Sequence, residues 1–313
     1  MKVLHVIPSL SQAHGGATSA LVSMEAALLA AGVGVETAAT DDDGPGRRNG
    51  HVCGVPLQEG GAVRWYFPKR TEFYKASPAF MRWIADNVTR YDLVHIHALF
   101  SFTSLVAARA AKRAAVPYII EPLGTLNDYG LTQRRPWLKQ LSLRLLEAPL
   151  LRSAAAVRFT SQQEALEARR LGLSLKEAVI PLGVELPPLA PTSVAPLGAN
   201  DTIGLLFLSR LDPKKNLEGL LDAMSLLRES APQVHLVIAG DGPGPYVEQL
   251  KARCARLEIA DIVHWAGHLE SDAKEAAFAD ASIFVLPSFS ENFGMAAAEA
   301  LARGLPCVLG AGV

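Results

Sequence analysis

The sequence predicts an α/β protein with two domains, each a doubly wound parallel sheet covered by helices on both faces. Short β-branched runs alternate with helical patterns along the whole chain, and such alternation is typical of parallel sheets. A proline-rich stretch at residues 186–200 interrupts the series and has the composition of a linker. The length of 313 residues and the hydrophobic content of 50% allow each domain its own core.

In the first half, β-branched runs between polar turns predict the strands, and the longer helical patterns between them predict the helices. The predicted strands cover residues 2–8, 34–40, 91–98, 117–122, 155–161 and 177–185. The predicted helices cover residues 17–31, 104–115, 136–151 and 161–172. Gly32 follows the first helix, at the position where glycine commonly ends one. These elements predict an N-terminal domain over residues 1–188, followed by a linker over 189–200.

The same pattern then restarts and predicts a second domain over residues 201–313. Its predicted strands cover residues 202–209, 234–240, 262–267, 282–287 and 306–310. Its predicted helices cover residues 216–230, 246–258, 272–279 and 294–303, the first opened by Asn216 as a cap. A doubly wound domain usually continues beyond a fifth strand, so we expect this domain to be incomplete, either in a fragment or in a short gene product.

The charges nearly cancel, at a net −1, so nucleic acid is not an expected partner. Residues 1–190 hold 21 Lys and Arg against 16 Asp and Glu, and the acidic excess lies in the second half, which suggests different partners for the two domains. Three scattered cysteines imply neither a disulfide framework nor a zinc knuckle and agree with a cytoplasmic location. The first residues predict a strand rather than a signal peptide.

Three cations follow the first strand of the second domain. Arg210 ends the strand, and Lys214 and Lys215 precede a helix. Ligands of open parallel sheets bind at the carboxyl ends of strands, and cations at a helix N-terminus oppose the helix dipole. A bound phosphate would offset the unfavourable interaction of these cations with the helix dipole. The alternative is a pair of solvated lysines on a turn, with Asp212 as their partner.

Two acids lie eight residues apart around the last predicted helix. Glu291 follows the strand at 282–287, where it would also be explained as an acid stabilised by the helix dipole. Glu299 lies in a helix that is apolar on every side, which predicts a buried helix. A buried carboxylate needs a hydrogen-bond partner, either a protein group or a polar ligand such as a ribose.

Glycines after two strands allow close approach of a backbone to a phosphate. Gly15 and Gly16 follow the first strand directly before a helix, although many such turns need only a positive φ. The stretch GDGPG at 240–244 lacks the spacing of a dinucleotide fingerprint, and we interpret it as a tight turn. The absence of that fingerprint makes an NAD oxidoreductase the weakest reading.

His97 ends a strand and could contact a ligand, whereas His95 lies deeper and is expected in the core. No third ligand stands at suitable spacing along the chain, so the sequence predicts no metal site. The acids at 41–43 lie in a polar, glycine-rich tract that predicts a solvated loop. Two basic, aromatic stretches, 64–83 and 134–146, predict either contact with an anionic membrane or lipid acceptor, or ordinary helices whose long side chains cover a core.

Taken as an ordered set, these segments resemble family 4 of the glycosyltransferases, also called group 1. The stretch SFSENFGMAAAEALARGLP is similar to the family's paired-acid segment, and LSRLDPKKNLEGLLDA to its diphosphate segment. VIPLGVE, IAGDGP, HIHALF and the early Gly-Gly are similar too. The resemblance implies the GT-B fold, two Rossmann-like doubly wound domains facing across a cleft. It also implies a retaining transfer from a nucleoside-diphosphate-sugar, without cofactor or metal, to a glycan or lipid-linked acceptor bound by the first domain.

The resemblance also implies residue roles. Arg210, Lys215, the amides near Gly15 and Gly16, and those around Phe293, Gly294 and Met295 would stabilise the departing diphosphate. Glu291 would contact the sugar, Glu299 the ribose, and His97 would orient the sugar. Family members continue beyond residue 313, so we expect this length of chain to bind donor weakly. A catalytically silent sugar-nucleotide module, or an epimerase or hydrolase on the same fold, are the alternatives. Bacterial surface polysaccharide assembly is the expected setting.

Overall fold

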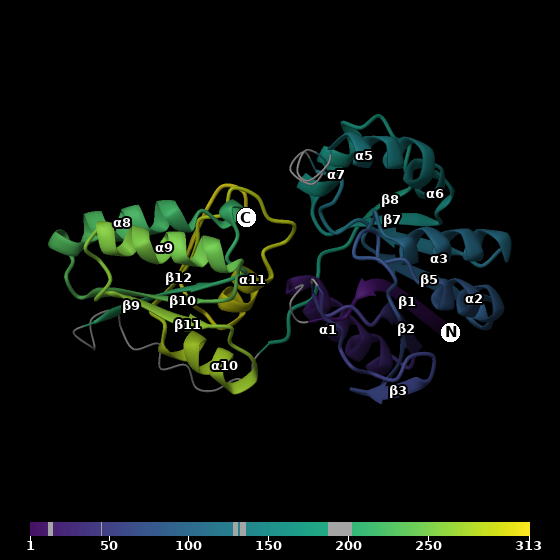
Figure 1. The fold of residues 1–313 in the computed structure, drawn as a ribbon, viewed down its shortest axis with the longest axis horizontal. Coiled ribbons are helices and arrows are strands. Elements are labelled where there is room, and N and C mark those ends of the chain that lie inside the picture. The colour runs from purple at the N-terminus through teal and green to yellow at the C-terminus, as the bar shows by residue number, and fades with distance from the viewer. Residues whose placement is uncertain (12–14, 45, 128–130, 132–135, 187–201) are drawn as a thin grey trace. The chain divides into compact units, whose positions relative to one another are not determined.

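The computed structural model describes residues 1–313 except 12–14, 45, 128–130, 132–135 and 187–201. The chain forms two compact units, Met1–Gly183 and Val184–Val313, and each is a sheet flanked by helices (Figure 1). The predicted α/β class with two parallel-sheet domains is therefore confirmed. The predicted linker, 189–200, lies outside the described residues.

The first unit contains an eight-stranded sheet in the order β3-β4-β2-β1-β5-β6-β7-β8. Its strands are β1 (Lys2–Ser9), β2 (Gly34–Thr40), β3 (Pro56–Glu59), β4 (Ala62–Phe67), β5 (Leu93–His97), β6 (Tyr118–Glu121), β7 (Ala156–Phe159) and β8 (Glu177–Val179). Only β3 runs antiparallel to its neighbour. Its helices are α1 (Gly16–Ala30), α2 (Pro78–Asn87), α3 (Phe102–Arg113), α5 (Pro136–Ser142), α6 (Ala148–Ser153) and α7 (Gln162–Arg169), and a π-helical segment, Leu143–Glu147, joins α5 to α6.

The second unit contains a five-stranded parallel sheet in the order β11-β10-β9-β12-β13. Its strands are β9 (Ile203–Leu208), β10 (Val234–Ala239), β11 (Val263–Gly267), β12 (Ile283–Leu286) and β13 (Cys307–Leu309). Its helices are α8 (Leu217–Ser230), α9 (Gly244–Arg256), α10 (Ser271–Asp280) and α11 (Met295–Ala302). Figure 1 shows α8 and α9 on one face of this sheet and α10 on the other.

Two glycines let the turn after β10 lie against the loop after β9. A Cβ on Gly240 would lie 1.9 Å from the carbonyl oxygen of Ser209, and a Cβ on Gly242 would lie 2.4 Å from that of Leu211. Gly240 also has a φ of +141°, which other residues rarely adopt. The predicted tight turn at 240–244 therefore fixes the position of the loop that carries Arg210.

We expect Gly240→Ala to destabilise the second unit by about 1–3 kcal/mol, because both the backbone conformation and the close approach are lost. Scanning calorimetry should show its unfolding midpoint lowered by about 3 °C or more. Gly244→Ala is the matched control, since a Cβ there meets nothing within 4 Å in the described chain. Equal midpoints for the two variants would contradict this view of the turn.

Glu147 is a buried acid at the end of the π-helical segment. It is 1% exposed, and Oε1 has no hydrogen-bond partner among the residues that the structure describes. Burial raises the pKa of Glu147 to about 7, although the backbone N–H of Phe100, Arg109 and Ser142 act in the opposite direction. The carboxyl is therefore protonated in the folded chain under mildly acidic conditions.

Between about pH 4.5 and 7 the folded chain binds a proton at Glu147 that the unfolded chain releases. The free energy of unfolding must therefore fall as the pH rises through this window, by about 3 kcal/mol. We expect Glu147→Gln to remove this pH-dependent part of the free energy of unfolding. In urea denaturation, the free energies of unfolding of wild type and variant should therefore diverge as the pH increases. A pH-independent difference between wild type and Glu147→Gln would contradict the assignment.

Candidate active site

The second sheet has a switch point between β9 and β12. The chain runs from β9 to β10 and β11 on one side, and then crosses to β12 on the other side of β9. At such a point the loops that follow the two strands diverge and leave a crevice at their carboxyl ends, where doubly wound sheets bind ligands. Arg210, Lys214 and Lys215 follow β9, and Ser288 and Glu291 follow β12.

An ion pair between Lys215 and Glu291 joins these two loops. The Lys215 ammonium contacts Oε1 of Glu291, and the side chains are only 8% and 10% exposed. Ser288 Oγ donates to the same oxygen at 2.8 Å, and the backbone N–H of Phe289 donates to the carbonyl of Lys214 at 2.9 Å. The structure thus brings together the cation and the acid that the sequence placed in separate motifs.

Cations gather around Lys215. Burial lowers the pKa of Lys215, Glu291 raises it, and the neighbouring cations Lys214 and Arg210 lower it further. Because like charges repel one another, an anion bound among these cations would reduce their mutual repulsion. This place in the second unit is therefore electrostatically suited to a phosphate group.

The cap predicted at Asn216 is replaced by a different arrangement. Asn216 adopts a left-handed conformation with φ 56°, and its side chain makes no capping hydrogen bond to the described first turn of α8. Instead, Asp212 caps a short 3₁₀ helix, Pro213–Lys215, by accepting from the backbone N–H of Lys214 at 3.1 Å. Both lysines consequently lie on this 3₁₀ turn between β9 and α8.

Glu299 has a protein partner. Its Oε1 accepts from Nζ of Lys274, on α10, at 2.7 Å, and its side chain is 16% exposed. The prediction that α11 is buried all round is wrong, because its buried residues are Ala297 and Ala300. An alanine side chain exposes little apolar surface, so a helix rich in alanine need not be buried on every face. The predicted ribose contact of Glu299 would have to compete with Lys274.

The loop before α11 turns on Gly294, which caps the helix with φ 74°. Phe293 and Met295, on either side, are partly buried. The first backbone N–H groups of a helix lack intrahelical acceptors, so the amides that the resemblance assigned to the diphosphate belong to a helix terminus near Glu291. In the first unit, Gly15 has φ 66° and stands immediately before α1, which begins at Gly16.

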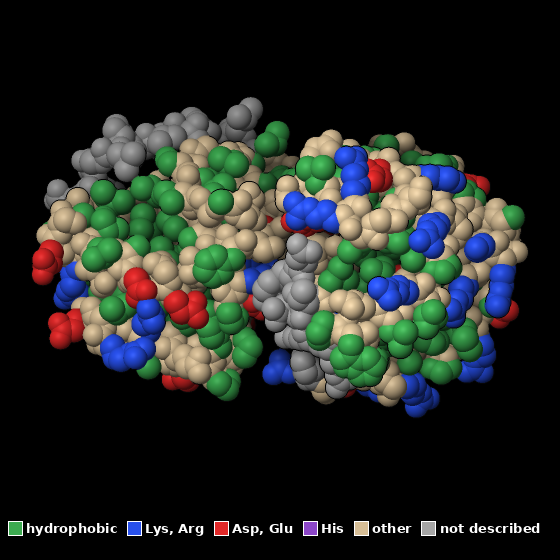
Figure 2. All heavy atoms as spheres, turned by 90° about the horizontal axis from the view of Figure 1, so that it is seen from above, with side chains coloured by type: hydrophobic (Ala, Val, Ile, Leu, Met, Phe, Trp, Pro, Cys, Tyr) green, Lys and Arg blue, Asp and Glu red, His purple; other side chains and the backbone are tan. Residues whose placement is uncertain are grey.

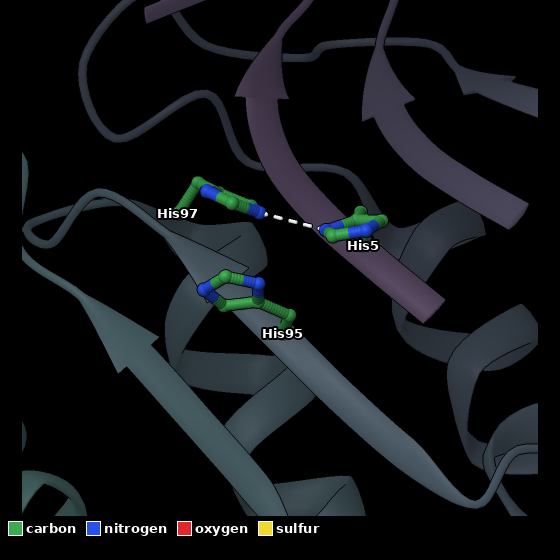
Figure 3. Close-up of side chains that lie close together, drawn as sticks. All are labelled: His5, His95 and His97. Atoms are coloured by element: carbon green, nitrogen blue, oxygen red, sulfur yellow. Dashed lines mark hydrogen bonds between the residues drawn. The ribbon is translucent and has the colours of Figure 1, made fainter. Parts of the chain in front are cut away.

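His97 lies inside a buried cluster of the first unit, where it is 2% exposed. Its Nδ1 is 2.9 Å from Oε2 of Glu121, and its Nε2 is 2.9 Å from Nδ1 of His5 (Figure 3). Burial, and to a smaller extent the charge of Arg158, lower the pKa of His97 to about 3. A contact between His97 and a sugar would require one of these ring contacts to open, so that role stays a prediction.

The acids at 41–43 and the basic stretch at 64–83 form ion pairs with each other. Asp41 and Asp42 are 4% and 1% exposed, which corrects the predicted solvated loop. Lys69 is buried and contacts Asp42 at 2.7 Å, and Lys75 contacts the same carboxylate. These two lysines are therefore held within the protein, whereas Arg70 and Arg82 of the same stretch are exposed.

The stretch that includes α5 presents a surface of exposed apolar and basic side chains. Trp137, Leu141 and Leu145, four residues apart, expose 66%, 50% and 65% of their surface, so they lie on one face of the helix. Arg144 and Arg152 are exposed along the same segment. Figure 2 shows basic and apolar side chains interspersed over the first unit with few acidic ones. Among the described helices, none is long and apolar enough to cross a membrane.

Sequence reasoning missed several partners in these sites. Ser288 and Lys274 have no signal of their own in a single sequence, because their role depends on which loops fold together. Glu121 and His5 could have been found, because each lies on a predicted strand that can pair with the strand of His97. Strand order, rather than residue spacing, was the missing information.

Two family models match the chain. A glycosyl transferase 4-like domain matches residues 15–183, and glycosyl transferases group 1 match residues 194–313. The chain is 30% identical over 249 residues to D-inositol 3-phosphate glycosyltransferase of Streptomyces scabiei, covering 74% of this chain and 55% of that protein. It is 32% identical over 146 residues to alpha-monoglucosyldiacylglycerol synthase of Streptococcus pneumoniae, covering 44% of this chain and 33% of that protein.

The fold is similar to that of solved GT-B proteins. The structure of Anabaena Alr3699/HepE in complex with UDP-glucose matches with a TM-score of 0.75 and 22% identity, covering 99% of this chain and 80% of that chain. Sucrose-phosphate synthase of Thermosynechococcus elongatus matches with the same TM-score and 20% identity, covering 99% of this chain and 81% of that chain. At these identities the likeness supports the fold alone.

Proposed function

Because this chain belongs to the group 1 glycosyltransferases, with a glycosyl transferase 4-like first domain, we propose that it transfers a sugar from a nucleoside-diphosphate-sugar to a glycan or lipid-linked acceptor. We further propose that the reaction retains the anomeric configuration and serves bacterial surface polysaccharide or glycolipid assembly. The observation that carries the proposal is the group of cations at the β9–β12 switch point, Arg210, Lys214 and Lys215, of which Lys215 pairs with Glu291.

Cleavage of the bond between the sugar and the diphosphate leaves negative charge on the departing phosphate. Fixed cations that face this charge stabilise the transition state more than the ground state. Arg210 and Lys215 follow the carboxyl end of β9, so both can face the diphosphate once the donor has replaced Glu291 as the partner of Lys215. A solved relative of the same fold was obtained with UDP-glucose, which supports a donor of this chemical class.

Glu291 and Glu299 would then exchange their protein partners for hydroxyl groups of the donor. A sugar hydroxyl can donate to Glu291 while the Lys215 ammonium turns to the phosphate. The hydroxyls of a ribose can donate to Glu299, which Lys274 holds at the edge of α11. In this proposal the two lysines hold the two acids in position until the donor binds.

For the acceptor, we propose a lipid-linked molecule reached from an anionic membrane surface at the inner face of the membrane. The relatives include enzymes named for diacylglycerol and phosphatidyl-inositol acceptors. The α5 face combines exposed Trp and Leu with arginines, the composition that binds the interface of anionic bilayers. Glu147, the one acid between residues 136 and 160, is buried and would not oppose such binding.

Arg210→Ala should lower kcat/KM by about 10–150-fold, because one charge-assisted contact to the diphosphate contributes about 1.5–3 kcal/mol. The measurement is release of nucleoside diphosphate from the UDP-, GDP- or ADP-sugar that the wild type uses, with and without acceptor. Arg228→Ala is the matched control, because Arg228 pairs with Asp261 on the surface of the same unit. Full turnover by Arg210→Ala would count against this site, and donor binding without transfer would favour a silent module.

The double variant Trp137→Gln with Leu141→Gln should bind anionic vesicles at least tenfold more weakly, because each exposed apolar side chain contributes about 1 kcal/mol or more on burial. Co-sedimentation with phosphatidylglycerol vesicles measures this binding, and neutral phosphatidylcholine vesicles test the electrostatic part. Leu226→Gln is the control, since Leu226 is 79% exposed in the second unit. Equal vesicle binding by the double variant and wild type would refute the proposal that the α5 face binds a membrane.

A further inference from the structure

Strand pairing brings three histidines together on the first sheet. In the parallel pairing of β1 with β5, His5 stands opposite His95. His95 and His97 are two residues apart on β5, so their side chains project on the same face. In the pairing of β5 with β6, Glu121 stands opposite His97. Three imidazoles and one carboxylate, from three adjacent strands, therefore meet at one place.

The ring nitrogens of the three histidines converge. One nitrogen from each of His5, His95 and His97 lies within 4.8 Å of the others, and Figure 3 shows the rings facing a common point. His5 Nδ1 and His97 Nε2 are 2.9 Å apart. Zinc binds imidazole nitrogen at about 2.0–2.1 Å in tetrahedral geometry, so the nitrogens need only small adjustments to surround one ion.

The cluster is buried and leaves ring nitrogens without partners. His5, His95 and His97 are 0%, 7% and 2% exposed, and Nε2 of His5 and of His95 has no hydrogen-bond partner within the described residues. Because a buried polar atom without a partner is costly, these nitrogens favour a bound ligand.

Glu121 stands behind His97 in the position of a supporting carboxylate. Its Oε2 lies 2.9 Å from Nδ1 of His97, which leaves Nε2 facing His5 and His95. A metal-binding histidine commonly donates its other ring N–H to a carboxylate, which fixes its tautomer. Arg158 also contacts Oε2, at 3.2 Å, whereas Oε1 has no partner in the described chain. The negative charge of Glu121 would partly offset that of a divalent cation.

We propose that His5, His95 and His97 form a binding site for one Zn²⁺ ion, with Glu121 as the carboxylate that orients His97. The ion ties β1 to β5 at the centre of the first sheet. It takes the place of the contact between His5 and His97. The site lies in the first unit, and with His97 bound to the ion the predicted contact between His97 and the donor sugar would not form. A search along the sequence misses it because its third ligand comes from a strand about 90 residues away.

The test uses the full chain without an affinity tag, after treatment with a chelator and dialysis. Calorimetric titration with ZnCl₂ should show one site with a Kd of about 1 µM or tighter, and Zn²⁺ should raise the thermal midpoint. Co²⁺ in place of Zn²⁺ should give the strong visible absorption of a tetrahedral nitrogen-ligated site. Absence of saturable binding, or the weak spectrum of the hydrated Co²⁺ ion, would overturn the proposal.

Variants locate the site. His5→Gln and His95→Gln should each weaken Zn²⁺ binding at least 100-fold, and Glu121→Gln should weaken it about 10–100-fold. The matched control His51→Gln, a histidine of the same unit outside the cluster, should bind as the wild type does. Undiminished binding by folded His5→Gln and His95→Gln, checked by circular dichroism, would overturn the proposal. If these variants do not fold, the Co²⁺ spectrum of the unmodified chain decides alone.

Discussion

The ion pair between Lys215 and Glu291 is the interaction on which the second unit's chemistry depends. It joins the loops after β9 and β12 across the switch point, in a position where both charges are about nine-tenths buried. A buried ion pair is costly to assemble, and breaking it leaves an uncompensated charge. Here the same two groups can serve a ligand, since an incoming phosphate satisfies the lysine and an incoming hydroxyl satisfies the acid. In this structure the two side chains of the proposed donor site are therefore paired with each other.

The two halves of the chain use buried charge differently. In the second unit, Arg210 and Lys214 lie near the ion pair of Lys215 with Glu291 and lower the pKa of Lys215. In the first unit, Asp41 and Asp42 are matched by Lys69, Lys75 and Arg48, and the imidazoles beside Glu121 are neutral. We therefore assign the proposed donor chemistry to the second unit and the proposed acceptor contact to the exposed α5 face of the first unit.

Much of the fold could be predicted from the sequence, because β-branched runs and helical patterns are local signals. The strands and helices of the second half lie within one or two residues of their predicted bounds. The β3–β4 hairpin and α2 were not predicted, because aromatic and basic residues in 56–87 obscure both the alternation typical of strands and the apolar repeat typical of helices. The sequence places Arg210, Lys215 and Glu291 after strands, and their roles stay predictions. The contacts of Ser288 and Lys274, and that of His5 with His97, depend on tertiary pairing. Alanine's small size explains why α11 was wrongly predicted to be buried.

The claim that Arg210 and Lys215 hold a diphosphate is tested most directly by comparing the affinity for each nucleoside diphosphate with that for its own nucleoside. Calorimetric titration of the chain with UDP, GDP and ADP, and with uridine, guanosine and adenosine, separates the phosphate contribution from that of the base. The account predicts that one diphosphate binds at least about 100-fold tighter than its nucleoside, since two charge-assisted contacts together contribute about 3 kcal/mol or more. Equal affinities for that diphosphate and its nucleoside would contradict it.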